Sequence, residues 1–382
     1  MAMVRVQQSR RPAQDLRVVF VTDGVAADAL VPQWDDLVAR AGSTPWATPA
    51  WGLGWWRAAP RSVRLRLVAV FDGDELVAVG PFCEVGPPGL RLVRFLGDDH
   101  QPNRVLTAPG RTAAASAVWA ALRQHGSALD LYCLEDRQGS GYRQLVEDPR
   151  WRLSDEPSDS CVSIVPGGAA EEYLATRTDL VKDMRRISRR LARDGHVLEV
   201  ARASTPDQVG ILLPEVAAVA AAAQRDRWKP GDLESLARGE VPGPLASMLR
   251  AGRLRLSLVR IDGRPAAFAL ELVGAGVVSG AVMAYDTEWQ PYAPGRRAME
   301  EGFRWAIDDG AREYDLGPGL GAYKSRWSDH EYQTRRVVAA PTAGELRVAR
   351  AGLSLRAAVK ARPTRRLRGS DPSPVPEVPA GG

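Results

Sequence analysis

The chain repeats one order of motifs, and this repetition constrains its fold more than any other feature. In the first half, Ala108-Pro109-Gly110-Arg111 precedes a helical stretch and then Leu129-Asp130-Leu131. In the second half, Ala293-Pro294-Gly295-Arg296 precedes a helical stretch and then Tyr314-Asp315-Leu316. The proline and the aspartate are 21 positions apart in both copies. A helix start and a strand that recur at constant spacing predict two copies of one structural unit.

Strand and turn signals extend the repeat upstream. An Arg-Leu-Arg-Leu strand occurs at 64–67 and again at 253–256, and an Asp-Gly turn follows at 72–73 and at 262–263. Strands followed by a helix and a returning strand, without a long uniform βαβ series, indicate mixed α/β units rather than a doubly wound sheet or a barrel. The fold class that we predict is therefore α/β with mixed sheets, in two fused units.

Four segments follow from this organisation. We predict a flexible N-terminus over 1–15, a first unit over 16–165, a second unit over 166–340, and a largely disordered basic tail over 341–382. The second unit is expected to begin with one long helix over 169–194, ended by Gly195. Only the second copy continues into Gly317-Pro318-Gly319-Leu320-Gly321-Ala322-Tyr323-Lys324, so we place the active site there.

The net charge of +5 is confined to the tail. Residues 341–382 contain eight cations and three acidic residues, which account for the whole excess. The folded body is therefore near neutral, which argues against a broad nucleic-acid surface. The three cysteines are odd in number and widely spaced, and no apolar stretch is long enough to span a bilayer. We expect a cytoplasmic protein without disulfides or membrane contact.

The predicted helix start at Pro294 is a candidate anion site. Free amides at a helix N-terminus attract anions, Gly295 permits close backbone approach, and Arg296 and Arg297 add positive charge. A pyrophosphate suits this chemistry. The alternative from the residues alone is an ordinary helix start with two solvated arginines.

The glycine-rich loop after Asp315 is a second candidate. It lacks the Walker ending and the dinucleotide spacing, and Pro318 removes an amide donor. A turn at the carboxyl end of a strand is nevertheless where α/β units bind ligands. Tyr323 can donate a proton and Lys324 can hold an anion, although the two residues fit an ordinary helix start equally well.

Three motifs of the second copy stand in register with those of a known family. They are Asp286 to Tyr292-Ala293-Pro294-Gly295, then Glu313-Tyr314-Asp315-Leu316-Gly317, and then Tyr323-Lys324-Ser325-Arg326-Trp327. Together they resemble the C-terminal core of the bacterial GNAT-like acyltransferases grouped with the cellulose-biosynthesis CelD proteins. The segment 179–191 is similar to that family's basic helix, and Trp228 falls where the family usually has a tryptophan. The resemblance covers roughly residues 16–340.

The resemblance implies two fused GNAT domains, related in architecture to the Fem-type aminoacyl transferases. It implies acyl-CoA as co-substrate, with Tyr292, Pro294, Gly295, Arg296 and Arg297 around its pyrophosphate. The family's loop more often has an acidic residue near the position of Leu320 or Gly321. This chain has none there, which leaves the family's carboxylate unaccounted for.

Further substrate-binding candidates rest on weaker signals. Lys182 and Arg186 belong to a cationic helix that is either a solvated face or a phosphate-binding surface. Asp99 and His100 lie in a loop that is expected to face the cleft between the units, although a lone histidine is more often structural. No histidines stand at metal-ligand spacing, so we predict no metal.

The sequence thus predicts an acyltransferase that moves an acyl group, preferably acetyl, from CoA to an amine of a polar small molecule or sugar. Transfer is expected to be direct, because no Ser-His-Asp or Cys-His constellation is evident. Asp286 or Asp315 would accept the amine proton, Tyr323 would protonate the thiolate, and Lys324 would neutralise an anionic group.

Two alternatives use the same architecture. One is an aminoacyl-tRNA-dependent transferase, in which the basic helix and tail would hold RNA. The other is a non-catalytic binding protein, which the missing loop carboxylate favours.

Overall fold

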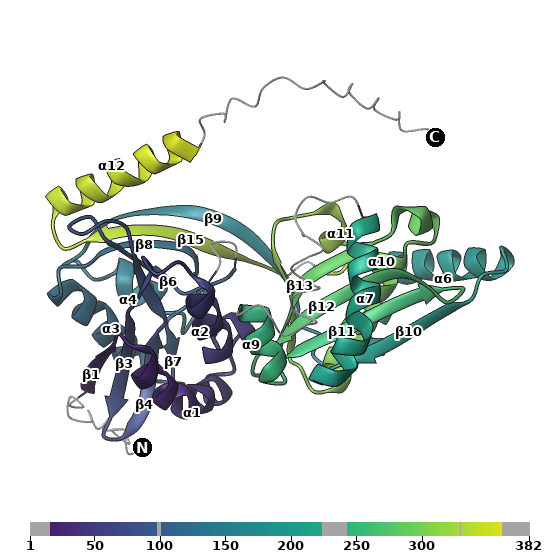
Figure 1. The fold of residues 1–382 in the computed structure, drawn as a ribbon, viewed down its shortest axis with the longest axis horizontal. Coiled ribbons are helices and arrows are strands. Elements are labelled where there is room, and N and C mark those ends of the chain that lie inside the picture. Colours follow the sequence, from purple (N-terminus) through teal and green to yellow (C-terminus); the bar gives the residue numbers. More distant parts are fainter. Residues whose placement is uncertain (1–15, 98–100, 224–242, 329, 361–382) are drawn as a thin grey trace, which may run out of the picture.

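The computed structural model describes residues 16–97, 101–223, 243–328 and 330–360 (Figure 1). The predicted flexible N-terminus and the end of the tail, 361–382, lie outside the described residues. Within them, mixed sheets flanked by helices confirm the predicted α/β class.

The first half contains both strands and helices. Its elements are β1 (Leu16–Val21), α1 (Gly24–Ala41), η1 (Pro45–Ala47), α2 (Pro49–Ala58), β2 (Arg64–Leu65), β3 (Leu67–Asp72), β4 (Glu75–Gly80), β5 (Phe82–Val85), β6 (Leu92–Phe95), β7 (Leu106–Thr107), α3 (Thr112–Gln124), β8 (Ala128–Glu135), α4 (Tyr142–Val146) and β9 (Arg152–Ile164). The repeated Pro-Gly motif leads into α3, as predicted.

The second half also contains strands and helices, and its Pro-Gly motif lies at the start of one helix. Its elements are α5 (Ala170–Thr176), α6 (Thr178–Arg193), β10 (Leu198–Ala203), α7 (Pro206–Ala222), α9 (Pro244–Arg250), β11 (Leu254–Ile261), β12 (Arg264–Val273), β13 (Val277–Tyr285), η2 (Thr287–Tyr292), α10 (Pro294–Asp308), β14 (Glu313–Pro318), α11 (Ala322–Ser325), β15 (Glu331–Ala340) and α12 (Ala343–Lys360). The Pro-Gly motif of this copy begins α10.

One large sheet runs through both halves. In the described residues, eleven strands follow the order β10-β11-β12-β13-β14-β9-β15-β8-β6-β5-β2, beside a four-stranded sheet β1-β3-β4-β7. The long strands β9 and β15 cross from one half to the other (Figure 1). β15 lies in the predicted second unit, yet it pairs with β8 of the first as well as with β9. The unit boundaries at 165 and 340 stay a prediction.

Tryptophans of the first half pack into the core of the second. Trp46 and Trp51 contact each other edge to face, with ring centroids 4.6 Å apart. Both belong to the cluster formed by α7, α9 and the inner face of β11 and β12. These aromatic side chains therefore help to hold the two halves together.

The predicted single helix over 169–194 is wrong, because the structure has two helices there. The break falls at Arg177, whose φ of −96° and ψ of 58° are not helical. Leu174 and Leu180 both pack on one core with Phe303 and Trp327. Six residues of continuous helix would leave them about 120° apart around the axis, and the break at Arg177 lets both face this core. Gly195, with φ +82°, follows α6 as expected.

The prediction of a disordered tail is also wrong for residues 343–360, which form α12. Leu346, Ala349 and Leu353 recur at helical spacing and pack against Leu92 and Val338. This three-residue apolar stripe is short and lies among arginines, so it was overlooked in the sequence. In Figure 1, α12 lies along β15 above the first half.

The packing of α12 leads to a first prediction. Ala349 is 7% exposed, whereas the neighbouring Val348 is 53% exposed on the same helix. Ala349→Asp should lower the free energy of unfolding by about 2–4 kcal/mol, because it places a charge in an apolar contact. The control Val348→Asp should stay within about 0.5 kcal/mol of the wild type. Equal urea midpoints for both variants would show that α12 does not pack on the sheet in solution.

Candidate functional site

Strands β13 and β14 form a fork in the second half. They pair in parallel only from Val277 opposite Glu313 to Ser279 opposite Asp315. β13 then continues to Tyr285, while β14 becomes irregular at Gly317, where φ is +69°, and ends at Pro318 beside β9. Because the strands separate, the backbone edge of β13 beyond Ser279 is available to a ligand with amide groups of its own.

The N-terminus of α10 lies beside the end of β13. Ala293 precedes it in a left-handed conformation with φ +45°, and Pro294 occupies the first turn. A Cβ on Gly295 would be 3.1 Å from the ring of Tyr285, so the glycine allows close packing of helix and strand. The structure confirms the predicted helix start, with Pro294, Gly295, Arg296 and Arg297 in the first turn of α10, and their role around a pyrophosphate stays a prediction.

Both arginines of this helix start are already paired with carboxylates. Arg296 donates to Asp183 of α6 at 2.5 Å, and Arg297 donates to Glu300 at 2.8 Å. Asp183 also pairs with Arg186 at 2.6 Å and with Arg326 at 3.1 Å. Hydrogen bonds from Arg186 and then from Arg296 and Arg326 lower the pKa of Asp183 to about 2. One carboxylate thus shares three guanidinium groups, and an excess of positive charge remains.

A pocket of about 400 Å³ lies between α6 and α10. It is lined by Leu174, Leu180, Val181, Met184, Arg185, Ser188, Arg189, Arg297, Glu300, Arg304 and Trp327. Arg185 and Arg189 form no ion pair with any part of the chain that the structure describes. Apolar walls with a cationic rim suit a ligand that carries both a hydrophobic portion and phosphate or carboxylate groups.

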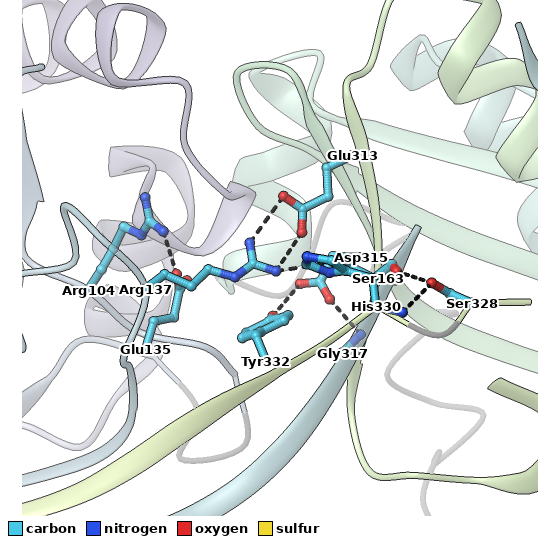
Figure 2. A network of polar contacts seen from close by, with 10 residues as sticks. All are labelled: Arg104, Glu135, Arg137, Ser163, Glu313, Asp315, Gly317, Ser328, His330 and Tyr332. Atoms are coloured by element: carbon cyan, nitrogen blue, oxygen red, sulfur yellow. Dashed lines mark hydrogen bonds and ion pairs between the residues drawn. The ribbon is translucent and has the colours of Figure 1, made fainter. Parts of the chain in front are cut away.

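Asp315 ends the paired part of the fork and is 1% exposed. Its Oδ1 accepts from the amide of Gly317 at 2.8 Å, and its Oδ2 accepts from the hydroxyl of Tyr332 at 3.0 Å. Burial raises its pKa to about 6, against the lowering effect of the Gly317 amide. Figure 2 shows these contacts beside the ion pair of Arg137 with Glu313.

Lys324 and Tyr323 follow the glycine loop but point in different directions. Lys324 is 5% exposed, and its Nζ donates to the carbonyls of Gly317 at 2.9 Å and Pro318 at 2.6 Å. Burial lowers its pKa. Tyr323 is 44% exposed. Lys324 thus stabilises the loop from inside, while Tyr323 is accessible to a ligand.

A buried carboxylate beneath α10 was missed in the sequence. Glu271 of β12 has no measurable exposure, and its Oε1 accepts a hydrogen bond from the hydroxyl of Tyr314. It lies against Gly302, where a Cβ would be 1.6 Å from Oε1. Burial raises its pKa to about 7. The available signal was a single acid in the apolar run Ala267–Leu272, with a glycine in the facing helix.

Other predicted residues lie away from the fork. Asp286 caps η2 by accepting from the amide of Glu288, and it is seven residues beyond Ser279 along β13, roughly 20 Å at strand spacing. It therefore does not join Asp315. Tyr292 donates to Asp194 at 3.1 Å on the outer side of η2.

Lys182 and Arg186 are exposed on α6. Asp99, His100 and Trp228 lie outside the described residues.

In the part of the chain that is described, no group of histidine, cysteine and acidic side chains is arranged to hold a metal ion. No helix in that part is long and apolar enough to cross a membrane.

Comparison with known proteins agrees with this geometry. A family model described as an acetyltransferase (GNAT) domain matches residues 178–325, which include the fork, α10 and the glycine loop. The fold of the chain is GNAT-like. No curated protein matches it.

Solved structures support the same fold across both halves. A structure of FemX is 12% identical, with a TM-score of 0.58, and the match covers 83% of this chain and 96% of that one. A conserved protein of unknown function from Bacteroides thetaiotaomicron VPI-5482 is 9% identical, with a TM-score of 0.52 and coverages of 85% and 100%. L-PGS from Bacillus licheniformis is 11% identical, with a TM-score of 0.50 and coverages of 86% and 96%. At these identities the likeness concerns the fold alone.

Proposed function

We propose that this protein is an N-acyltransferase that moves an acyl group from CoA to an amine of a polar small molecule or sugar. The observation that carries the proposal is the coincidence of three features on the second half. The N-terminus of α10 packs on β13, one arm of the β13–β14 fork, at Gly295, and Arg297 of the same helix turn lines the arginine-rimmed pocket. The match of residues 178–325 to a GNAT domain supports the same reading.

The donor would bind along α10 and β13. The amide of Gly295 and the guanidinium groups of Arg296 and Arg297 would bind the pyrophosphate, because helix amides and cations both favour an anion there. The free edge of β13 would hydrogen-bond the amide groups of the pantetheine arm. Asp183 and Glu300 hold the two arginines, so binding has to exchange those ion pairs for phosphate contacts.

Acyl transfer needs a proton acceptor and a proton donor. We assign the first role to Asp315, whose pKa of about 6 leaves it ionised at neutral pH and able to take the proton of an attacking amine. The nitrogen then bonds to the thioester carbon, the carbon–sulfur bond breaks, and Tyr323 gives its phenolic proton to the thiolate. Since Asp315 is 1% exposed, contact with an acceptor requires a rearrangement of the groups around it.

The finer assignments rest on the sequence resemblance. We propose that the protein belongs to the CelD type of GNAT-like acyltransferases and that acetyl is the acyl group. Its three cysteines are free and buried, which agrees with a reducing compartment, and we propose that it acts in the cytoplasm.

A second candidate function is aminoacyl transfer from tRNA. The specific observation that favours it is a set of exposed arginines along α6, namely Arg185, Arg186, Arg189, Arg190 and Arg193. Such a row can bind phosphates of an RNA backbone. The fold likeness to FemX is compatible with either donor.

The donor assignment predicts a difference between the two copies of the repeat. Arg296→Ala/Arg297→Ala should weaken CoA binding by about 1–3 kcal/mol, because charge-assisted hydrogen bonds to phosphate are lost. Arg111→Ala, at the corresponding position before α3, should leave the affinity unchanged. Calorimetric titration with CoA measures both. An unaltered affinity in the double variant would remove the pyrophosphate assignment.

The assignment of Tyr323 predicts a loss confined to turnover. Tyr323→Phe removes only a hydroxyl from a side chain that is 44% exposed, so folding and CoA binding should be preserved. Turnover should fall about 10²- to 10⁴-fold, which is typical of a positioned proton donor. Release of the CoA thiol with a panel of polar amines gives the rate. Wild-type turnover in this variant would mean that the thiolate leaves without the help of Tyr323.

A further inference from the structure

Arg137, in the loop after β8, extends from the first half into the candidate site of the second. Its guanidinium donates to both oxygens of Glu313, at 3.1 and 2.7 Å. The same group lies over the ring of Tyr332, 3.5 Å from the centroid. It also donates to Oγ of Ser163 at 3.3 Å. Figure 2 shows Arg137 reaching across toward these residues.

The partners of Arg137 are also the neighbours of Asp315. Tyr332 donates its hydroxyl to Asp315, and Glu313 precedes Asp315 by two residues on β14 and therefore lies on the same face of that strand. A planar guanidinium that stacks on a ring and binds a carboxylate through two bonds fixes both groups in orientation. Lysine has no such fork.

We propose that Arg137 is a positioning residue that the first half supplies to the second. It orients Tyr332, which donates a hydrogen bond to Asp315, and it neutralises the charge of Glu313 beside the Asp315 carboxylate. A role of Arg137 in catalysis rests on the proposed function. The contacts of Arg137 and their effect on the Asp315 carboxylate are independent of that function.

Charged and titratable groups face Asp315 from every element around it. They are Glu313 on β14, Tyr332 on β15, Cys161 on β9, Lys324 on α11, Glu135 at the end of β8, and Arg137. Burial raises the pKa of Asp315, and Glu313 and Glu135 raise it further, whereas the Gly317 amide and Arg137 lower it. Burial also raises the pKa values of Cys161 and Tyr332, so both stay neutral at physiological pH. Losing the charge of Arg137 removes an attraction and leaves Glu313 unpaired, and both effects raise the pKa of Asp315.

The sign of the pH dependence follows from linkage. Asp315 binds its proton more tightly in the native protein, with a pKa of about 6, than at its ordinary value of 3.8. Its protonation therefore contributes stability that is fully present below about pH 4 and is lost as the pH rises through about 6. Without Arg137 this loss should extend to higher pH.

The test compares unfolding free energies of the full chain in urea between pH 4 and 8. The difference in unfolding free energy between the wild type and Asp315→Asn gives the contribution of Asp315. The difference between Arg137→Gln and the double variant Arg137→Gln/Asp315→Asn gives the same contribution in the absence of the guanidinium. Glu271 titrates in the same pH range, but its contribution to the unfolding free energy is common to each pair of variants and cancels in both differences. The midpoint of the Asp315 contribution should rise by about one pH unit in the Arg137→Gln background.

Two further variants keep the result interpretable. Arg260→Ala breaks a two-bonded arginine–glutamate pair, with Glu215, at 2.6 and 2.7 Å, and should leave the Asp315 midpoint unchanged. Arg137→Lys keeps the ion pair but cannot stack flat on Tyr332, so its midpoint should lie between those of the wild type and Arg137→Gln. It serves as the test if the glutamine variant does not fold.

An Asp315 midpoint that is unchanged in whichever Arg137 variant folds would overturn the proposal, as would an equal shift in Arg260→Ala. These measurements need neither an acyl donor nor an acceptor. A failure to detect acyl transfer would therefore refute the proposed function without changing this result.

Discussion

The hydrogen bonds between β9 and β15 are the interaction on which the rest of the structure depends. The two strands pair from Glu331 opposite Val162 to Ala340 opposite Arg152, with one register shift. β9 also pairs with β14 at the fork, and β15 also pairs with β8 of the first half. Both halves therefore share one sheet, and a residue such as Arg137 can reach Glu313 without a flexible linker between them.

Asp315 lies on β14 of this shared sheet, where β14 separates from β13, and it is the centre of the candidate site. Its two oxygens bind the Gly317 amide and the Tyr332 hydroxyl, which fixes the turn that separates β14 from β13. Lys324 holds the same turn from the other side through two carbonyls. A buried carboxylate is costly unless it is hydrogen-bonded, so these contacts are what allow it to remain at the fork.

The repeat made much of this fold predictable, since strand patterns and the Pro-Gly helix starts depend on local sequence. The helix start at Pro294 and the glycine loop after Asp315 were found for the same reason. The pairing of β15 with β8 was not predictable, because it joins segments about 200 residues apart. The ion pair of Arg296 with Asp183, 113 residues away, was missed on the same ground. Such long-range contacts depend on tertiary packing, which leaves no period in the sequence.

The environment of individual side chains was equally hidden. Lys324 looked like an exposed anion ligand, but the loop folds back over it. Glu271 was not singled out in the sequence, and the structure buries it against Gly302. Lys324 meets the carbonyls of Gly317 and Pro318, and Glu271 meets the backbone of α10 at Gly302. The sequence shows these residues but not which side chain meets them.

Calorimetric titration of the full chain tests most directly whether the second half binds an acyl-CoA. Acetyl-CoA and CoA should bind with measurable heat, and bulk tRNA at the same ionic strength should not compete with them. Saturable binding of tRNA with no heat from either CoA compound would contradict the account and would favour an aminoacyl-tRNA donor.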